Sequence, residues 1–269
     1  MANVQDDLWV TPQWPARPHV HAVLTTRHGG ESLPPYESLN LGLHVGDAPA
    51  TVQANRARLR ERLRARPVFL DQVHGTEIVQ IDHETPDALR ADGAFTREAD
   101  LACTVMVADC LPILVCDRQG RQVAALHAGW RGLAGMGGVG IVELGLDRFR
   151  HLAPVKPGDE ANELIAWLGP CIGPRAFEVG DAVRVAFTDG DAQASGYFVA
   201  GAPGKWLADL PGLARHRLHR QGVDAVFGND STDDWCTVNQ RSRFFSHRRD
   251  GVSGRMAACI WLASANRRA

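Results

Sequence analysis

Three short segments place a metal-binding side chain at the end of an apolar run, beside glycine or close to proline. They are QVHG with His74, ADCLP with Cys110 and HAGWRG with His127. In a layered sheet the strand ends meet at one edge, so we expect these three side chains to lie together. Zinc accepts two imidazoles and a thiolate, and a three-residue ligand set keeps a fourth position open. The segments therefore predict a catalytic zinc site.

A metal-free nucleophile is the alternative use of the same residues. Cys110 activated by His127 or His74 would form a Cys–His pair that needs no zinc. Asp109 directly precedes Cys110, and we expect it to orient a ligand or to act as a base. The spacing of these residues leaves both chemistries open.

The composition is that of an ordinary globular protein. The 269 residues carry 29 Lys and Arg against 31 Asp and Glu, a formal net charge of −2, which does not point to nucleic acid. No apolar run approaches the roughly 18 residues of a transmembrane helix, and the start lacks the pattern of a signal peptide. The six cysteines form no C-x-x-C pair, which fits a reducing compartment. We expect a cytoplasmic protein that acts on small molecules and binds neither nucleic acid nor membrane.

Apolar periodicity predicts alternating strands and helices. TVMVA and PILVC are nearly continuous apolar runs, typical of strands covered on both faces. Helices are expected over residues 51–66, 133–149, 180–187 and 205–221. Strands are expected over residues 21–27, 68–70, 76–81, 103–108, 113–116, 122–127, 164–168 and 255–263. Without a repeat or linker between them, these elements favour one α/β domain.

Several motifs together resemble the bacterial laccase-domain family, also called the purine nucleoside phosphorylase or peptidoglycan editing factor family. They are QVHG, ADCLP, HAGWRG, GPCIG followed by FEVG, and Cys236-Thr237 followed by FFSHRRD. The resemblance implies a single-domain α/β/β/α sandwich with mixed sheets over residues 1–269, with residues 1–18 as an N-terminal extension. It also implies a monomer or weak homo-oligomer that binds zinc through His74, Cys110 and His127. Copper can occupy the same ligands.

The resemblance implies purine nucleoside chemistry, by a transferase that is also a hydrolase. The reactions are phosphorolysis of adenosine, inosine, guanosine and methylthioadenosine, and deamination of adenosine. The alternative is a hydrolase that edits a peptidoglycan precursor, an amino-acid-bearing muramic acid nucleotide. A four-copper oxidase is not expected, because it needs several His-x-His pairs and the chain offers one, His19 and His21. A binding protein with structural zinc is disfavoured by the three-residue ligand set.

The predicted catalytic residues are Asp109, Cys110, His127 and His74. In deamination, Asp109 would shuttle protons beside the metal. Phosphorolysis also needs cations for phosphate, because guanidinium groups match phosphate oxygens. The candidates for this role are Arg56, Arg131 and Arg248. Asn40 and Gln72 match motif positions of the family, and their amides are candidates for binding a purine edge or a ribose hydroxyl.

Three further residues, Trp130, Phe245 and His28, are candidates for the pocket wall. Trp130 and Phe245 have rings that can stack on a base. His28 precedes two glycines and is a candidate for the same wall. His247 stands where the family motif commonly has Tyr, which puts any role of that hydroxyl in doubt here.

Overall fold

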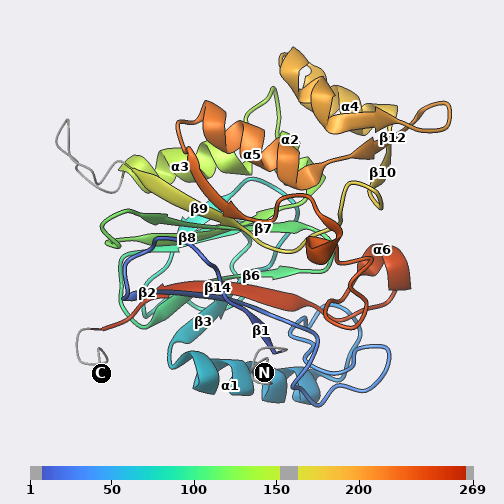
Figure 1. Cartoon of the computed structure of the whole chain (residues 1–269). Helices are drawn as coiled ribbons and strands as arrows, with labels where there is room; N and C mark the ends of the chain where they lie inside the picture. Colours follow the sequence, from blue (N-terminus) through green and yellow to red (C-terminus); the bar gives the residue numbers. More distant parts are fainter. Residues whose placement is uncertain (1–7, 152–162, 265–269) are drawn as a thin grey trace, which may run out of the picture.

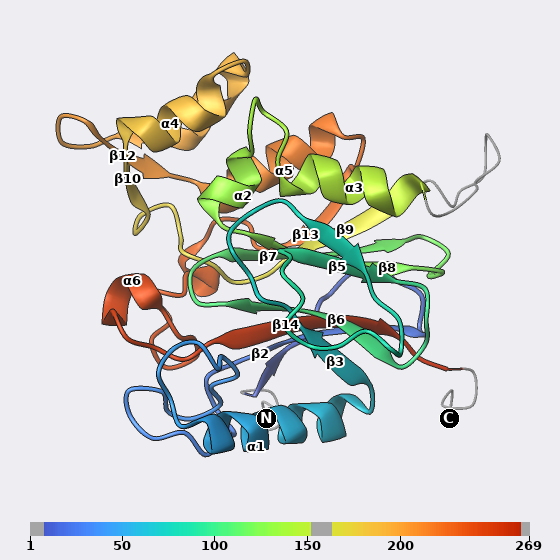
Figure 2. The same cartoon turned by 180° about the vertical axis from the view of Figure 1, so that it is seen from behind.

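Two stacked β-sheets between layers of helices form the centre of the molecule (Figure 1). The computed structural model describes residues 8–151 and 163–264. One helix, α1 (Pro49–Leu63), covers the outer face of the lower sheet in Figure 1. Seen from behind in Figure 2, three helices cover the upper sheet: α2 (Trp130–Ala134), α3 (Ile141–His151) and α5 (Leu210–Arg220). The predicted α/β/β/α sandwich is therefore confirmed.

The lower sheet has five strands. Their spatial order is β1 (Trp9–Val10), β2 (Val20–Thr25), β14 (Met256–Leu262), β6 (Leu101–Val107) and β3 (Arg66–Phe69). Only β3 runs parallel to its neighbour, so the sheet is mixed. β1 lies within the predicted N-terminal extension and adds an edge strand, while residues 1–7 lie outside the described residues.

The upper sheet has six strands. Their spatial order is β13 (Ala225–Gly228), β9 (Leu164–Leu168), β7 (Leu111–Asp117), β8 (Val123–Ala128), β5 (Gly93–Thr96) and β4 (Ile78–Gln80). The two outer pairs are parallel and the three inner pairs antiparallel. Both central sheets are therefore mixed, as predicted.

Both faces of the central strands are covered. Every residue of β6, β7 and β14 is buried. Side chains alternate along a strand. In β7, Ile113 and Val115 accordingly pack toward the upper helices, whereas Leu114 and Cys116 pack between the sheets. The apolar runs TVMVA and PILVC thus correctly predicted strands that need a cover on each side.

A smaller antiparallel sheet lies at one end of the sandwich (Figure 1), in the order β10 (Glu178–Gly180), β12 (Lys205–Ala208) and β11 (Phe198–Ala200). Beside it lie α4 (Asp181–Thr188) and the 3-10 helix η2 (Ala192–Tyr197). The 3-10 helix η3 (Asp233–Trp235) and the single turn α6 (His247–Asp250) precede β14 along the chain. These segments border the end of the sandwich at which the loops with the candidate functional residues lie.

The predicted helix 205–221 is wrong over its first residues, which form β12. Helix α5 begins only after Asp209, whose carboxylate accepts a hydrogen bond from the Gly212 N–H at 2.9 Å. Pro211 stands in the first turn, where its missing N–H leaves no helical bond unmade. The N-cap aspartate and this proline therefore fix the start of the helix.

The predicted helix 133–149 is also divided. Its first residues end α2, and α3 begins at Ile141. Gly135, Gly137 and Gly138 between them have φ of 65°, 59° and 79°. These left-handed conformations suit glycine and interrupt a right-handed helix.

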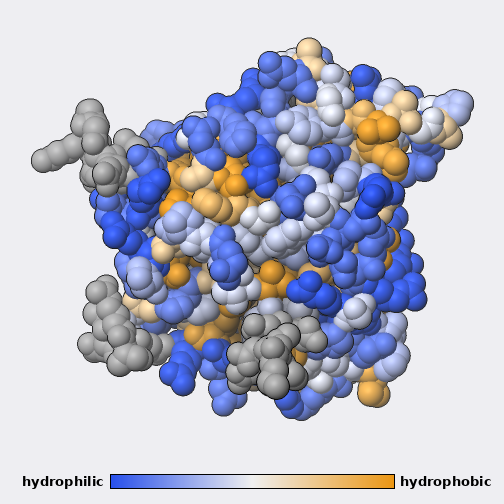
Figure 3. All heavy atoms as spheres, in the orientation of Figure 1, coloured by the Kyte–Doolittle hydropathy of each residue, from blue (hydrophilic) through white to orange (hydrophobic). Residues whose placement is uncertain are grey.

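The surface is mostly polar. On the face shown in Figure 3, hydrophilic residues dominate and hydrophobic ones are interspersed in small groups. The most exposed large apolar side chains belong to different segments, among them Met136 (89% exposed) and Leu33 (76%). Within the described residues, none of the helices has both the length and the apolar character needed to cross a bilayer.

Candidate metal centre

His74, Cys110 and His127 lie together where the chain crosses between the two sheets. His74 is in the link from β3 to β4, Cys110 in the link from β6 to β7, and His127 in β8. Their ligand atoms all lie within 4.8 Å of one another. Cys110 Sγ is 3.6 Å from His74 Nε2, and the two imidazole rings meet edge to face. The structure thus brings together the three residues that the sequence singled out.

Glycines of HAGWRG make room for this convergence. A Cβ at Gly129 would lie 2.8 Å from His74 Cδ2 and 3.1 Å from Cys110 Sγ. At Gly132 it would lie 2.6 Å from the Gly75 carbonyl oxygen. Both positions therefore need glycine for the loop that carries His74 to approach β8.

The three side chains fit a tetrahedral metal ion. Zinc bound to nitrogen at about 2.0–2.1 Å and to sulfur at about 2.3 Å separates two nitrogens, or a nitrogen and a sulfur, by roughly 3.3–3.6 Å. The Cys110–His74 distance of 3.6 Å lies in this range. Nδ1 of His127 is engaged by Asp92 Oδ1 at 2.8 Å, which leaves Nε2 for the metal. The donor set and its spacing therefore match zinc with small side-chain adjustments.

The electrostatics of the cluster favour a thiolate. Burial opposes ionisation of Cys110, but His127 and His74 outweigh it through charge and hydrogen bonds and lower the pKa of Cys110 from 9.0 to about 6. Burial likewise opposes the charged form of His127, while Cys110 and Asp92 raise its pKa from 6.5 to about 9. Without metal, the pair is a thiolate and an imidazolium at neutral pH. The thiolate can act as a nucleophile or bind a metal, and a metal that binds here displaces the proton from His127 Nε2.

Asp92 supports the cluster through hydrogen bonds, and the sequence analysis did not single it out. Besides His127, its carboxylate accepts hydrogen bonds from the backbone N–H groups of Val73, His74 and Gly75 at 3.2, 2.9 and 2.6 Å. Burial opposes its negative charge, but these donors and His127 outweigh it and lower the pKa of Asp92. Its only local signal is the Asp-Gly pair before β5.

Asp109 makes different contacts from those expected. Its carboxylate accepts hydrogen bonds from the Thr237 hydroxyl and from the Arg248 backbone N–H, both at 2.6 Å. The carboxylate that orients a histidine of the cluster is therefore Asp92, and Asp109 instead ties the cluster loop to the segment before β14. The expected role of Asp109 as a base stays a prediction.

A cavity of about 440 Å³ opens onto the cluster, and we call it the cluster cavity. One wall is apolar and includes Trp130, Ile172, Phe177 and Leu210. Asp109 and the cationic side chains Arg131, Arg248 and Arg255 also line it. The cavity therefore combines the ligand cluster, an apolar wall and positive charge.

The predicted substrate-binding residues divide into two groups. Gln72, Arg131 and Arg248 line the cluster cavity, although the Gln72 amide is committed to the Met106 backbone, with bonds of 2.7 and 2.9 Å. Asn40 is fully buried, and its Oδ1 accepts hydrogen bonds from the N–H groups of Gly42 and Arg255. It therefore shapes the backbone around the cavity from outside the lining.

Arg56 also lies outside the cavity lining. Its Nε donates to the Leu41 carbonyl at 2.9 Å, and its guanidinium lies 3.7 Å from the Phe69 ring centroid. Burial is the main reason that the pKa of Arg56 is lowered. In this structure Arg56 packs α1 on the lower sheet, and its phosphate-binding role stays a prediction.

Arg255 and His44 line the cavity and were not singled out from the sequence. Arg255 Nη1 donates to the carbonyl groups of Ser253 and Gly254 at 2.9 and 3.1 Å. Burial lowers the pKa of Arg255, and nearby Cys110 and Asp109 act in the opposite direction. No local motif marks either residue. Arg255 lies beside the cluster because β14 pairs with β6.

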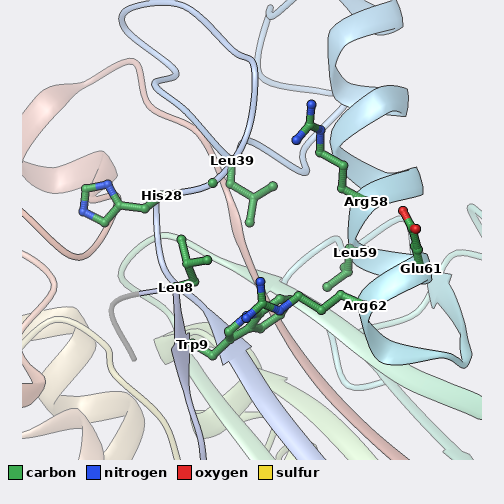
Figure 4. Close-up of a pocket in the computed structure, with 9 residues that line it drawn as sticks. Leu8, Trp9, His28, Leu39, Arg58, Leu59, Glu61 and Arg62 are labelled. Carbon is green, nitrogen blue, oxygen red and sulfur yellow. The ribbon is translucent and has the colours of Figure 1, made fainter. Parts of the chain in front are cut away.

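The remaining candidates have separate locations. Trp130 lines the cluster cavity, with the Arg131 guanidinium 4.5 Å from its ring centroid, and His247 lines it from α6. Phe245 is fully buried in the core, so its expected stacking on a base is wrong. His28 lines a second cavity of about 420 Å³ between the first strand and α1, which we call the Trp9 cavity (Figure 4).

Sequence comparisons with known proteins agree with the family resemblance. A family model described as multi-copper polyphenol oxidoreductase laccase matches residues 21–263. A Pseudomonas aeruginosa protein named purine nucleoside phosphorylase is 50% identical over 255 residues, covering 94% of this chain and 98% of that protein. The Escherichia coli K12 protein named purine nucleoside phosphorylase YfiH is 47% identical with the same coverage.

Comparisons with solved structures agree with the fold. A Neisseria meningitidis protein of the DUF152 family matches with a TM-score of 0.85 at 44% identity, covering 96% of this chain and 100% of that chain. YlmD from Geobacillus stearothermophilus matches with a TM-score of 0.85 at 32% identity, covering 97% and 98%. Sequence and structure together confirm the resemblance: this chain belongs to the laccase-domain family, described as multi-copper polyphenol oxidoreductase laccase and as DUF152.

Proposed function

We propose that this protein is a zinc-dependent purine nucleoside enzyme. It phosphorolyses adenosine, inosine, guanosine and methylthioadenosine and also deaminates adenosine. The observation that carries the proposal is the cluster cavity, which combines a Cys-His-His ligand set, an apolar wall and three arginines. The names of the Pseudomonas aeruginosa and Escherichia coli relatives support the phosphorylase activity.

The apolar wall suits a purine base. Trp130 and Phe177 offer aromatic surface, and Ile172 and Leu210 extend it with aliphatic groups. Ligand pockets of this kind bury most of a small molecule against apolar side chains and orient it with a few polar groups. The volume of about 440 Å³ is sufficient for one nucleoside with phosphate beside it.

The three arginines suit phosphate. In phosphorolysis a phosphate oxygen forms a bond to C1′ of the ribose while the C1′–N9 bond breaks, and the base leaves with the electron pair and takes up a proton. Arg131, Arg248 and Arg255 would bind and orient the phosphate, because guanidinium groups form paired hydrogen bonds with its oxygens. Asp109 would accept a hydrogen bond from a ribose hydroxyl, or move a proton during deamination.

His74, Cys110 and His127 would hold the zinc. When bound, zinc supplies a Lewis acid beside the substrate. Copper can occupy the same set of nitrogen and sulfur ligands. Across residues 8–151 and 163–264, one group of three or more His, Cys, Asp or Glu side chains is close enough to hold a metal. A four-copper oxidation needs several such groups, so we do not include it in the proposal.

We place the enzyme in the reducing cytoplasm as one domain over residues 1–269, a monomer or weak homo-oligomer. All six cysteines are free thiols, and five of them are buried. Buried free thiols persist where glutathione keeps cysteines reduced. The proposed partners are the small molecules of the reaction, a nucleoside and phosphate.

Product analysis tests the proposal. Zinc-quantified protein is incubated with adenosine and inosine, with and without phosphate, and adenine, hypoxanthine, inosine and ribose phosphate are separated by chromatography. We expect phosphate-dependent base release that is lost in Cys110→Ala and retained in the control Cys116→Ala. Cys116 is buried at the opposite end of β7. Zinc-loaded protein without turnover on any nucleoside would reject the proposal and favour the editing of a cell-wall precursor.

A further inference from the structure

We propose that Asp92 is a positioning residue that sets the geometry of two of the three metal ligands. The inference rests on the proposed metal site at His74, Cys110 and His127. Asp92 itself does not belong to the ligand cluster and does not line the cluster cavity. Its effect must therefore pass through the two histidines.

The four contacts of Asp92 divide between its two oxygens. Oδ1 accepts from His127 Nδ1 at 2.8 Å and from the His74 N–H at 2.9 Å. Oδ2 accepts from the N–H groups of Val73 and Gly75 at 3.2 and 2.6 Å. The side chain is fully shielded from solvent, so water does not replace any of these bonds at low cost.

The first consequence concerns the tautomer of His127. A carboxylate can only accept, so the hydrogen bond to Asp92 places the proton of neutral His127 on Nδ1. Nε2 then carries the lone pair and faces Cys110 and the metal position. A metal-binding histidine needs this arrangement, and a carboxylate on its other nitrogen also fixes the ring orientation.

The second consequence concerns the backbone of His74. This residue has φ of 61°, in the left-handed region that non-glycine residues rarely adopt. Three consecutive N–H groups, those of Val73, His74 and Gly75, converge on the one carboxylate. The surroundings thus hold an unfavourable conformation that directs the imidazole toward Cys110.

A backbone hydrogen bond of Asp92 connects its effect on the His127 ring with its effect on the His74 backbone. The Asp92 carbonyl accepts the His127 N–H at 2.7 Å, so Asp92 binds both the backbone and the ring of His127. One residue thereby fixes the relative position of two ligands that lie 53 positions apart along the chain, at residues 74 and 127.

The Asp92→Asn substitution tests the inference without changing side-chain size. All four partners of the carboxylate donate a hydrogen bond. Asparagine offers one oxygen and one NH2 group, so the two donors on the side of the NH2 group lose their acceptor and face another donor. We expect the dissociation constant for zinc, measured by competition with a chromophoric chelator, to rise about 10-fold to 100-fold. We also expect the visible spectrum of the Co²⁺-substituted protein to change shape.

Asp117→Asn is the matched control. Asp117 is also buried and accepts hydrogen bonds from the N–H groups of Arg121 and Gln122, but it lies at the end of β7 farthest from Cys110. Loss of this aspartate removes a buried carboxylate of similar kind and should leave zinc affinity and the Co²⁺ spectrum unchanged. Unchanged zinc affinity and spectrum in Asp92→Asn would overturn the inference.

A measurement on the unmodified chain covers the case in which Asp92→Asn does not fold. The ¹⁵N chemical shifts of His127 in the zinc-loaded protein identify which ring nitrogen is protonated. Protonated Nδ1 with metal on Nε2 is expected, and the reverse would overturn the inference. These readouts use zinc or cobalt alone, so a lack of nucleoside turnover would reject the proposed substrate without affecting the role of Asp92.

Discussion

The cluster cavity and the Trp9 cavity are nearly equal in volume, at about 440 and 420 Å³, yet they differ in chemistry. In the Trp9 cavity the Arg58 side chain is paired with Glu31, and the Arg62 guanidinium lies 5.0 Å from the Trp9 ring centroid. In the cluster cavity a thiol, four imidazoles and three arginines converge. Convergence of unlike functional groups therefore identifies a site better than volume does.

The thiols of the molecule differ in a similar way. Burial raises the pKa of Cys116 and Cys259 to about 12 in each case. Cys110 alone among these is surrounded by imidazoles, which outweigh burial and lower its pKa to about 6. A cysteine in the core is thus kept as a neutral apolar group, whereas the cluster is built to hold a thiolate.

Loss of a ligand should have the largest effect. We expect Cys110→Ala to lower phosphorolysis at least about 1,000-fold, because the zinc and the charge of the cluster are lost together. Steady-state kinetics on metal-quantified protein measure this effect. Arg62→Ala in the Trp9 cavity serves as the comparison, and an equal loss there would remove the distinction between the two cavities.

Metal removal should act through the same residues. Chelation should abolish turnover, and added zinc should restore it. Zinc at 100 times its dissociation constant should raise the free energy of unfolding by about 2.7 kcal/mol if it binds only the folded chain. Denaturant titration with and without zinc measures this difference. Cys110→Ala should show no such increase, and an increase of equal size there would place the zinc elsewhere.

Arg255 should affect phosphate more than nucleoside. We expect Arg255→Ala to raise the KM for phosphate about 10-fold to 100-fold, the loss of one charge-assisted hydrogen-bonding group. The KM for inosine should change much less. Arg58→Ala is the matched arginine of the Trp9 cavity and should leave both constants unchanged. A selective rise in the KM for inosine in Arg255→Ala would contradict its assignment to phosphate.

The pH dependence of Cys110 reactivity is the next expected effect. In metal-free protein the thiol is protonated below its pKa and becomes a thiolate above it, so alkylation should accelerate as pH rises through about 6 and then level off. Mass spectrometry of iodoacetamide-treated protein measures the rate. His127→Gln should move this transition upward, since the imidazolium that favours the thiolate is removed. A transition near 9 in the parent chain would contradict the electrostatics described above.

Substitutions in the Trp9 cavity should have the smallest effect. His28→Ala should leave turnover unchanged and alter the free energy of unfolding by no more than about 0.5 kcal/mol, as for most surface positions. Denaturant titration and the phosphorolysis assay measure both quantities. Strong loss of turnover with an intact fold would show that this cavity takes part in the reaction.

The sequence predicted the layers and the cluster because both have local signals. Uninterrupted apolar runs such as TVMVA marked strands buried on both faces, and His74, Cys110 and His127 each stood at or shortly after the end of an apolar run. Glycines beside them marked close approach of backbone. These features depend on residues near one another along the chain.

Other parts of the site depend on pairing between distant strands. Arg255 reaches the cavity because Met256 pairs with Val107 across β14 and β6. Asp92 reaches His127 because Gly93 pairs with Leu126 across β5 and β8. No local periodicity encodes this register, which explains why Asp109, the neighbour of Cys110 along the chain, was expected in the place of Asp92.

Crystals of the zinc-loaded protein soaked with inosine, measured at the zinc absorption edge, would locate the metal and the nucleoside together. We expect one anomalous peak bonded to His74 Nε2, Cys110 Sγ and His127 Nε2, with the nucleoside in the cluster cavity against Trp130 and Phe177. A peak at other ligands, or a nucleoside bound in the Trp9 cavity, would contradict the proposed site.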